Sequence, residues 1–156
     1  MAITYAKDAD AAESVVKAIG FAGIKAIAIQ AEAADAEAVK GAVEKTVATF
    51  GRLDVLVNNA GTAIPNPFEE AMLEEMGRVL DINIRGVLAA TQATLKHMKD
   101  GGCIIMIGSA VGERAVAPGL VPYVATKGPS RWRCPERLGA EASRSTTSSR
   151  DRSTWT

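Results

Sequence analysis

The sequence predicts an α/β fold with a parallel sheet, and two observations lead to it. Short apolar runs alternate with amphipathic helical stretches through the first 128 residues, and such helices are the crossover connections that parallel strands need. Hydrophobic residues make up 47% of the chain and aromatic residues 4%, which is typical of a packed domain rich in Ala, Val and Ile. At 156 residues, the chain is long enough for one ordinary core.

The first predicted unit is a strand, a helix and a second strand. Residues 2–6 form a short β-prone run. Asp8 or Asp10 can cap the following helix, which ends near Gly20. Residues 24–29 alternate apolar side chains as a second strand. The apolar face of the helix consists of Val15, Val16 and Ile19.

The second predicted helix and the third strand have clear boundaries. Asp35 begins the helix, and Gly51 closes it. Residues 55–57 form the strand, which leads directly into an Asn-Asn-Ala-Gly segment at 58–61. The apolar stripe of the helix consists of Val39, Val43, Val47 and Phe50.

A long helical stretch and a fourth strand complete the predicted elements of the sheet. The stretch covers residues 69–98, and interruptions are expected near Gly77 and Gly86. A glycine pair at 101–102 then turns the chain into an apolar strand over residues 103–107.

Charge and composition exclude several classes of function. The net charge is zero, which gives no electrostatic basis for binding nucleic acid or an anionic membrane. No apolar run reaches the length of a membrane span, and the N-terminus lacks a signal pattern, so we expect a cytoplasmic protein. Two cysteines provide neither metal-ligand spacing nor a disulfide framework, so no metal is expected.

Candidate catalytic residues lie in the second half of the chain. Tyr123 and Lys127 are four residues apart, so they share one face of a helix. An ammonium group near a phenol favours the phenolate, which makes such a pair a usable general acid/base at neutral pH. Taken alone, this spacing is usually just a helix face, and the 58–61 segment has an alternative as an Asn-Gly-type turn. Ser109, at the end of an apolar strand, favours the catalytic interpretation.

Together with Asn83, these residues resemble the active site of the short-chain dehydrogenase/reductase family, whose members move a hydride between NAD(P) and a carbonyl or alcohol. The resemblance covers residues 2–128 and implies a Rossmann-like fold with a doubly wound parallel sheet. In that family the tyrosine exchanges a proton with the substrate oxygen. The lysine lowers the pKa of the tyrosine and holds the nicotinamide ribose. The serine hydrogen-bonds the substrate oxygen, and the asparagine supports a proton relay. The resemblance assigns these roles to Tyr123, Lys127, Ser109 and Asn83.

The resemblance also implies a set of cofactor-binding residues, which includes Tyr123 and Lys127. Asn59, Ala60 and Gly61 end a strand at the carboxyl edge of the sheet, where ligands bind in open α/β folds. Glu32 and Ala33 follow the second predicted strand, where the family usually has an aspartate that contacts adenine.

Lys7 bears on the choice between NAD(H) and NADP(H). It follows the first predicted strand, where an enzyme that prefers NAD usually has an acid for the ribose 2′-hydroxyl. Because no acid precedes Asp8, Lys7 can face a 2′-phosphate, and we expect NADP(H) in preference to NAD(H). A solvated surface lysine is an equal alternative.

The resemblance begins at the family's second strand, so the first strand and its glycine-rich phosphate turn are expected to be missing. In the strand order 3-2-1-4-5 that strand lies at the centre, and its loss predicts two half-sheets with unpaired inner edges. The strands after the Tyr/Lys helix are also expected to be missing. We therefore expect an incomplete Rossmann-like domain over residues 1–128 and no hydride transfer by the chain as printed.

The last 28 residues differ from the rest of the chain. Sixteen of them are Ser, Thr or Arg, and apolar periodicity stops at Gly128. A coding sequence for residues 141–156, read two bases later, gives GITVNNVQPGPIDMD, which resembles the family's sixth strand and its Pro-Gly loop. We interpret residues 129–156 as an irregular Ser/Arg-rich tail produced by a frameshift. The alternative is a basic interaction tail.

The sequence leaves three possible functions. The first is a reductase of ketones or dehydrogenase of secondary alcohols, most similar to the 3-oxoacyl-[acyl-carrier-protein] reductase branch because of the segment at 83–87. It would take a small-molecule carbonyl or alcohol substrate, and the family forms homo-oligomers. The second is a catalytically inactive remnant that acts as a binding or oligomerisation module. The third is a non-catalytic nucleotide-binding module.

Overall fold

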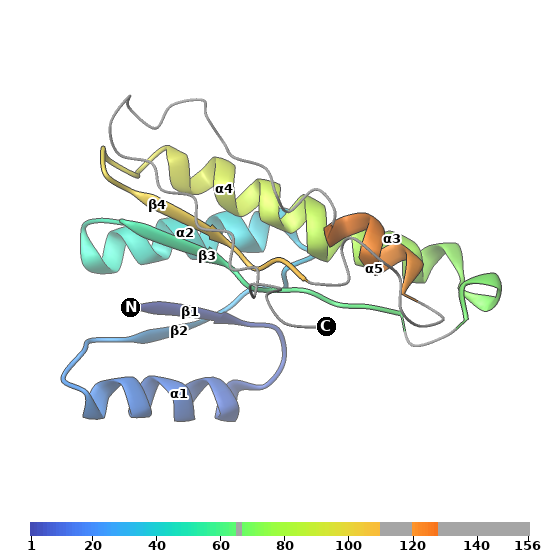
Figure 1. Ribbon diagram of the computed structural model, residues 1–156. Helices are drawn as coiled ribbons and strands as arrows, with labels where there is room; N and C mark the ends of the chain where they lie inside the picture. Colours follow the sequence, from blue (N-terminus) through green and yellow to red (C-terminus); the bar gives the residue numbers. More distant parts are fainter. Residues whose placement is uncertain (65–66, 110–119, 128–156) are drawn as a thin grey trace, which may run out of the picture.

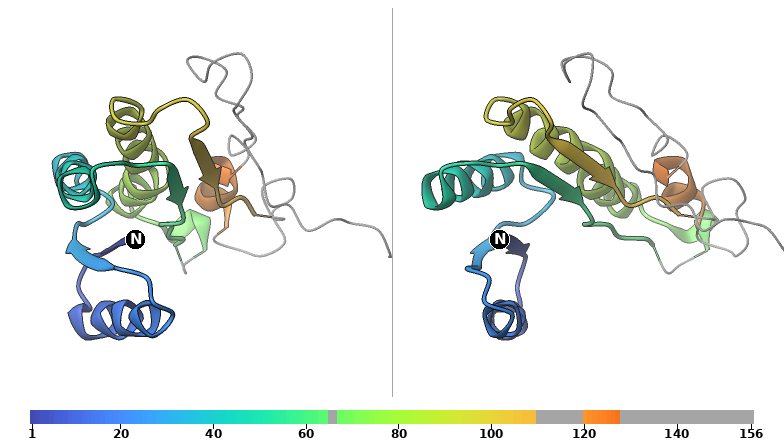
Figure 2. Two further views of the ribbon diagram at one scale, coloured as in Figure 1. Left: turned by 90° about the vertical axis from the view of Figure 1, so that its left-hand side faces the viewer. Right: turned by 60° about the vertical axis from the view of Figure 1, so that its left-hand side comes forward.

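The computed structural model describes residues 1–64, 67–109 and 120–127. The tail at 129–156, which the sequence separates from the rest, lies outside the described residues. Figures 1 and 2 show strands and helices alternating along the chain, as the sequence predicts. Among the described residues, no helix combines the length and the apolar character that crossing a bilayer requires.

The strands form two separate parallel pairs. β1 (Ala2–Tyr5) pairs with β2 (Ile27–Gln30), and β3 (Val55–Asn58) pairs with β4 (Cys103–Met106). Within the described residues, β1 and β3 each pair on one side only, so the prediction of two half-sheets is confirmed. The second strand begins three residues later than predicted, because the chain turns at Gly23 with a φ of 76° before it extends.

α1 (Ala9–Phe21) is the crossover helix of the first half-sheet. Of the two capping candidates, Asp8 is the N-cap, since its Oδ1 accepts from the Ala11 backbone N–H at 2.8 Å. The predicted apolar face is only partly covered: Val16 and Ile19 are half-buried, whereas Val15 is 47% exposed. In both views of Figure 2, α1 and its two strands lie together at one end of the molecule.

α2 (Ala36–Phe50) connects the two half-sheets and has the predicted ends. Asp35 accepts hydrogen bonds from the backbone N–H groups of residues 37 and 38, and Gly51 ends the helix with a φ of 74°. Val43 on the predicted stripe is buried. The helix packs on β2 and on α4 (Val87–Leu95), and Figure 1 shows the two helices side by side.

The predicted helix over residues 69–98 is three segments and a short 3₁₀ turn. The 3₁₀ turn (Phe68–Glu70) is separated from α3 (Leu73–Leu80) at Met72, whose N–H donates to Glu75 Oε2 at 3.0 Å. The prediction of an interruption near Gly77 is wrong, since that residue lies inside α3. Near Gly86 the backbone widens into the π-helical segment η2 (Asp81–Gly86) and continues into α4. A π-helical turn inside a longer helix is frequently a functional feature.

α5 (Val121–Lys127) lies against α3 and η2 and carries two of the predicted catalytic residues. Figure 1 shows it beyond the carboxyl end of β4. One cluster of buried apolar residues lies between β2 and α2. The most buried apolar residues outside it are Val79, Ala93 and Ile64, and Ile82 of η2 and Ile104 of β4 are also buried.

Candidate active site

The side chain of Asn83 connects three segments of the predicted site. It lies in η2 and is 6% exposed. Its Oδ1 accepts from the Thr62 backbone N–H at 2.9 Å, and its Nδ2 donates to the Thr62 carbonyl at 2.9 Å and to Thr126 Oγ1 at 2.9 Å. Both N–H donors of the amide are therefore used within the protein. The side chain holds the loop after β3 against α5.

This network explains why asparagine, a middling helix former, lies within a helical segment. A buried amide without partners would be strongly destabilising, whereas this one is hydrogen-bonded at both polar atoms. The proton-relay role that the resemblance assigns to Asn83 stays a prediction. The structure adds a positioning role for its side chain.

Tyr123 and Lys127 lie together on α5, as their spacing predicts. The Nζ atom of Lys127 is 5.6 Å from the centroid of the Tyr123 ring. The same Nζ donates to the carbonyl oxygen of Ile107 at 2.8 Å, which holds the ammonium group at the end of β4. The lysine thus connects the predicted acid/base helix to the strand that leads to the predicted serine.

Ser109 lies just beyond β4 and is partly buried. It is two residues past Ile107, the carbonyl of which binds Lys127. The chain direction therefore brings Ser109 to the region of α5. Its role towards a substrate stays a prediction.

The Asn-Asn-Ala-Gly segment begins at the carboxyl end of β3. Asn58 Nδ2 donates to Met106 Sδ at 3.2 Å and lies 3.4 Å from Thr91 Oγ1, so this amide connects β3 with β4 and α4. Asn59 and Ala60 are exposed and accessible to a ligand. The tie between strands is made by Asn58, which the sequence analysis did not include among the site residues.

Gly61 brings the loop backbone close to two predicted catalytic residues. A Cβ atom at this position would lie 3.6 Å from Asn83 Oδ1 and 3.7 Å from Lys127 Nζ. These are ordinary contact distances, so a small side chain would fit here, but it would touch both polar groups. The loop therefore forms one wall around the lysine.

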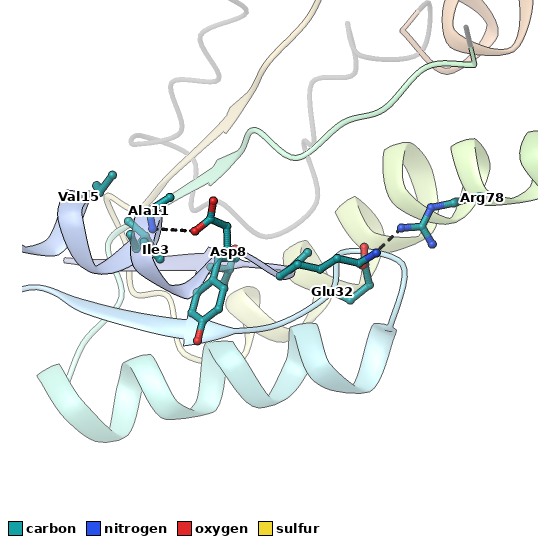
Figure 3. Close-up of a pocket in the computed structure, with 11 residues that line it drawn as sticks. Ile3, Asp8, Ala11, Val15, Glu32 and Arg78 are labelled. Carbon is teal, nitrogen blue, oxygen red and sulfur yellow. Dashed lines mark hydrogen bonds and ion pairs between the residues drawn. The ribbon is translucent and has the colours of Figure 1, made fainter. Parts of the chain in front are cut away.

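A second group of predicted residues lines a cavity at the carboxyl ends of β1 and β2. The cavity has a volume of ≈ 640 Å³, and both Lys7 and Glu32 line it. Figure 3 shows Arg78 reaching from α3 towards Glu32, and the two side chains form an ion pair with 3.4 Å between Nη2 and Oε2. Arg78 was missed by the sequence analysis, because nothing in a helical arginine predicts a partner 46 residues away.

Asp8 also lines this cavity, but its carboxylate is used at the start of α1. In Figure 3 it faces the backbone of Ala11. Ala33, the other predicted adenine contact, packs on η2: a Cβ at Gly86 would lie 2.1 Å from the Ala33 carbonyl oxygen. The predicted cofactor residues thus divide between this cavity and the loop at 59–61. Among the described residues, no cluster of three or more His, Cys, Asp or Glu side chains could hold a metal ion.

Comparison with known proteins identifies the family of this chain. The family profile described as short chain dehydrogenase matches residues 1–131. An uncharacterized oxidoreductase of Methylorubrum extorquens is 46% identical over 126 residues, which cover 81% of this chain and 50% of that protein. A 3-oxoacyl-[acyl-carrier-protein] reductase of Staphylococcus aureus is 42% identical over 130 residues, covering 81% and 52%. The chain spans about half the length of these curated relatives.

Solved structures of similar fold lead to the same family. A short chain dehydrogenase from Burkholderia cenocepacia, in complex with NADP, has a TM-score of 0.79 at 41% identity and covers 81% of this chain and 52% of its own. A short-chain dehydrogenase/reductase from Serratia marcescens has a TM-score of 0.78 at 46% identity, with coverage of 81% and 52%. The predicted partial Rossmann fold is confirmed. This chain belongs to the short-chain dehydrogenase/reductase family.

Proposed function

We propose that this chain carries the acid/base residues of an NAD(P)-dependent oxidoreductase that interconverts a ketone and a secondary alcohol. The observation that carries the proposal is the placement of the Lys127 ammonium group. It is held at the end of β4 by the Ile107 carbonyl and lies 5.6 Å from the Tyr123 ring centroid. A cation held beside the tyrosine that transfers the proton is the arrangement that general acid/base catalysis by this pair requires.

Each residue has a distinct part in the proposed reaction. A bound nicotinamide supplies or accepts the hydride. Tyr123 gives a proton to the substrate oxygen in reduction and takes it back in oxidation, while Ser109 hydrogen-bonds the same oxygen. Lys127 keeps a positive charge beside the phenol, and Asn83 fixes the loop after β3 against α5. Electrostatic stabilisation of this kind depends on groups that are held in place beforehand.

We propose NADP(H) as the preferred cofactor. The cavity at β1 and β2 contains two cationic side chains, and Glu32 pairs with Arg78 whereas Asp8 is used by α1. This leaves Lys7 as a candidate for a phosphate group. Related structures support the choice, because the Burkholderia cenocepacia enzyme is in complex with NADP and a blue fluorescent protein from a metagenomic library is in complex with NADPH.

The variant Lys7→Ala tests the cofactor preference. It should weaken NADPH binding about tenfold, the size of one charged hydrogen bond, and change NADH binding little. Lys17→Ala is the matched control, since Lys17 lies on the same half of the molecule and pairs with Glu13 outside the cavity. Equal losses for NADPH and NADH, or no loss for either, would contradict the proposal.

The proposed substrate class is a 3-oxoacyl thioester or a related ketone, which is supported by the Staphylococcus aureus relative. We also propose a homo-oligomer as the working form. Apolar side chains on α3 and α4 are strongly exposed, which supports a partner surface there. These residues are Leu73, Leu80 and Leu88.

The experiment that tests the function is an assay of the 156-residue chain with NADPH and a panel of ketones that includes a 3-oxoacyl thioester. Turnover that disappears in Tyr123→Phe supports the proposal. Thr49→Val is the control, because it also removes one hydroxyl group, which donates to the Lys45 carbonyl within α2 and lies outside the cavity and α5. Turnover that survives in Tyr123→Phe would remove Tyr123 from the mechanism.

A catalytically inactive chain is the second candidate. One observation favours it: β1 and β3 each pair on one side only within the described residues. Absence of turnover in every arm of the assay, with the purified chain folded, would support this candidate.

A further inference from the structure

Thr126 lies at the centre of the hydrogen-bond network around Asn83, a position that the sequence did not predict. It is 3% exposed, and its hydroxyl makes two hydrogen bonds. Oγ1 accepts from Asn83 Nδ2 at 2.9 Å and donates to the Tyr123 backbone carbonyl at 2.7 Å. Because Asn83 also binds the backbone of Thr62, a single hydroxyl group lies between η2, the loop after β3 and α5.

We propose that Thr126 is a positioning residue for the acid/base pair, acting through its hydroxyl group. A hydroxyl has one donor, and Thr126 uses it on the Tyr123 carbonyl. Its oxygen is then available only as an acceptor on the side facing Asn83. The Thr62 N–H and carbonyl fix the orientation of the Asn83 amide, and the Thr126 oxygen accepts the second Nδ2 proton on the side of α5. The inference rests on the proposed function for its catalytic consequence, but the hydrogen-bond arrangement can be tested without it.

The placement of Lys127 follows from the same contact. Lys127 is the next residue, and its Nζ must reach the Ile107 carbonyl at 2.8 Å while the Gly61 backbone lies alongside. Thr126 fixes this turn of α5 relative to the loop. Loss of the hydroxyl would leave one Asn83 donor without its partner in a buried position, so α5 would lose its hydrogen bond to η2 and could move.

The hydroxyl and the methyl group of Thr126 can be separated by substitution. Thr126→Val keeps the shape and removes the hydroxyl, whereas Thr126→Ser keeps the hydroxyl and removes the methyl group. Thr46→Val is the matched control, because Thr46 Oγ1 also donates to a carbonyl of its own helix, at 2.8 Å from Ala42, and lies outside the site.

The first test is NMR hydrogen exchange on the 156-residue chain. In Thr126→Val, the side-chain amide protons of Asn83 and the backbone amide of Thr62 should exchange about tenfold to a hundredfold faster, the range expected when a buried donor loses its partner. In Thr126→Ser and Thr46→Val, exchange at both groups should stay within about twofold of the unsubstituted chain. Unchanged protection in Thr126→Val, or equal loss in Thr126→Ser, would overturn the proposal.

The second test does not depend on a variant folding. In the unsubstituted chain, the Thr126 hydroxyl proton should exchange slowly enough to be observed and should show an NOE to the Asn83 side-chain amide. A hydroxyl proton that exchanges at the rate of a surface threonine would refute the proposed contact, whatever the behaviour of Thr126→Val.

Kinetics then connect the contact to the proposed reaction. Thr126→Val should lower kcat about tenfold or more with KM within about twofold, and Thr126→Ser should restore it. A rise in KM at constant kcat would assign the hydroxyl to substrate binding and overturn the positioning role. If the unsubstituted chain shows no turnover, the proposed function fails, while the exchange measurements still decide whether Thr126 holds Asn83.

Discussion

Replacing Gly86 with alanine should destabilise the protein, although alanine is the better helix former. A Cβ atom at this position would lie 2.1 Å from the Ala33 carbonyl oxygen and 3.2 Å from its carbonyl carbon. The first distance is far below any ordinary contact, and the obstacle is backbone, which cannot rotate away as a side chain can. The loop containing Ala33 or the η2 backbone must therefore move by about an ångström or more.

Two opposing terms decide the size of the effect. Gly→Ala in a helix interior gains up to about 1 kcal/mol from helix propensity. Forcing an extra methyl group into a packed position costs about 1–3 kcal/mol or more. Because the clash is with backbone, the upper part of that range applies, and we expect a net loss of about 1–2 kcal/mol in the free energy of unfolding.

Urea unfolding followed by circular dichroism measures this change, with Gly77→Ala as the matched control. Gly77 lies inside α3, and a Cβ there would meet nothing within 4 Å. The control should therefore gain up to about 1 kcal/mol. If Gly86→Ala is as stable as Gly77→Ala, the reasoning from the Ala33 contact is refuted. A second consequence is weaker NADPH binding, since the displaced loop also carries Glu32.

Three further predictions concern the hydrogen bonds of other segments. Asn83→Ala should cost about 2–4 kcal/mol in chemical unfolding, because it leaves the partners of a buried amide unpaired, whereas Asn59→Ala at an exposed position should cost less than about 0.5 kcal/mol. Asp35→Ala should lower the unfolding free energy by about 1 kcal/mol through loss of the α2 cap, measured in the same way. The bidentate Arg52 side chain holds the pKa of the Asp54 carboxyl below its usual range, so Arg52→Ala should raise that pKa in a carbon NMR titration. The stabilisation from this depressed pKa is present above the unfolded-state pKa and is lost as the pH falls through the folded-state value, so wild type and variant should converge in acid.

The sequence was sufficient for the elements whose ends have local causes. Asp35 and Gly51 bound α2 because a capping carboxylate and a positive φ are properties of single residues. The spacing of Tyr123 and Lys127 was sufficient to place both on one face of α5. The break expected at Gly77 was wrong, because a single glycine weakens a helix by less than the surrounding packing stabilises it.

The contacts between distant segments could not be read from the sequence. Arg78 meets Glu32 across 46 residues, and Thr126 meets Asn83 across 43. Neither threonine nor arginine in a helix carries a pattern that specifies such a partner. The resemblance to a family identified Asn83 as important, but only the structure shows that both N–H donors of its side chain are used to hold the chain together.

These long-range contacts decide how the two parts of the site face each other. β1 and β3 belong to separate sheets in the described residues, so strand hydrogen bonds do not fix the cavity at Lys7 relative to the loop at 59–61. The cavity and the loop are held relative to each other by α2, which packs on α4, and by the Ala33 backbone, which lies on Gly86. If the clash in Gly86→Ala is relieved by movement of the Ala33 loop, cofactor binding is disturbed and the Asn83–Thr126 contact stays intact. If η2 moves instead, Asn83 moves with it, because both residues lie in that segment. Exchange protection at the Thr62 amide separates the two cases, and its loss in Gly86→Ala would show that the two halves of the site are not independent.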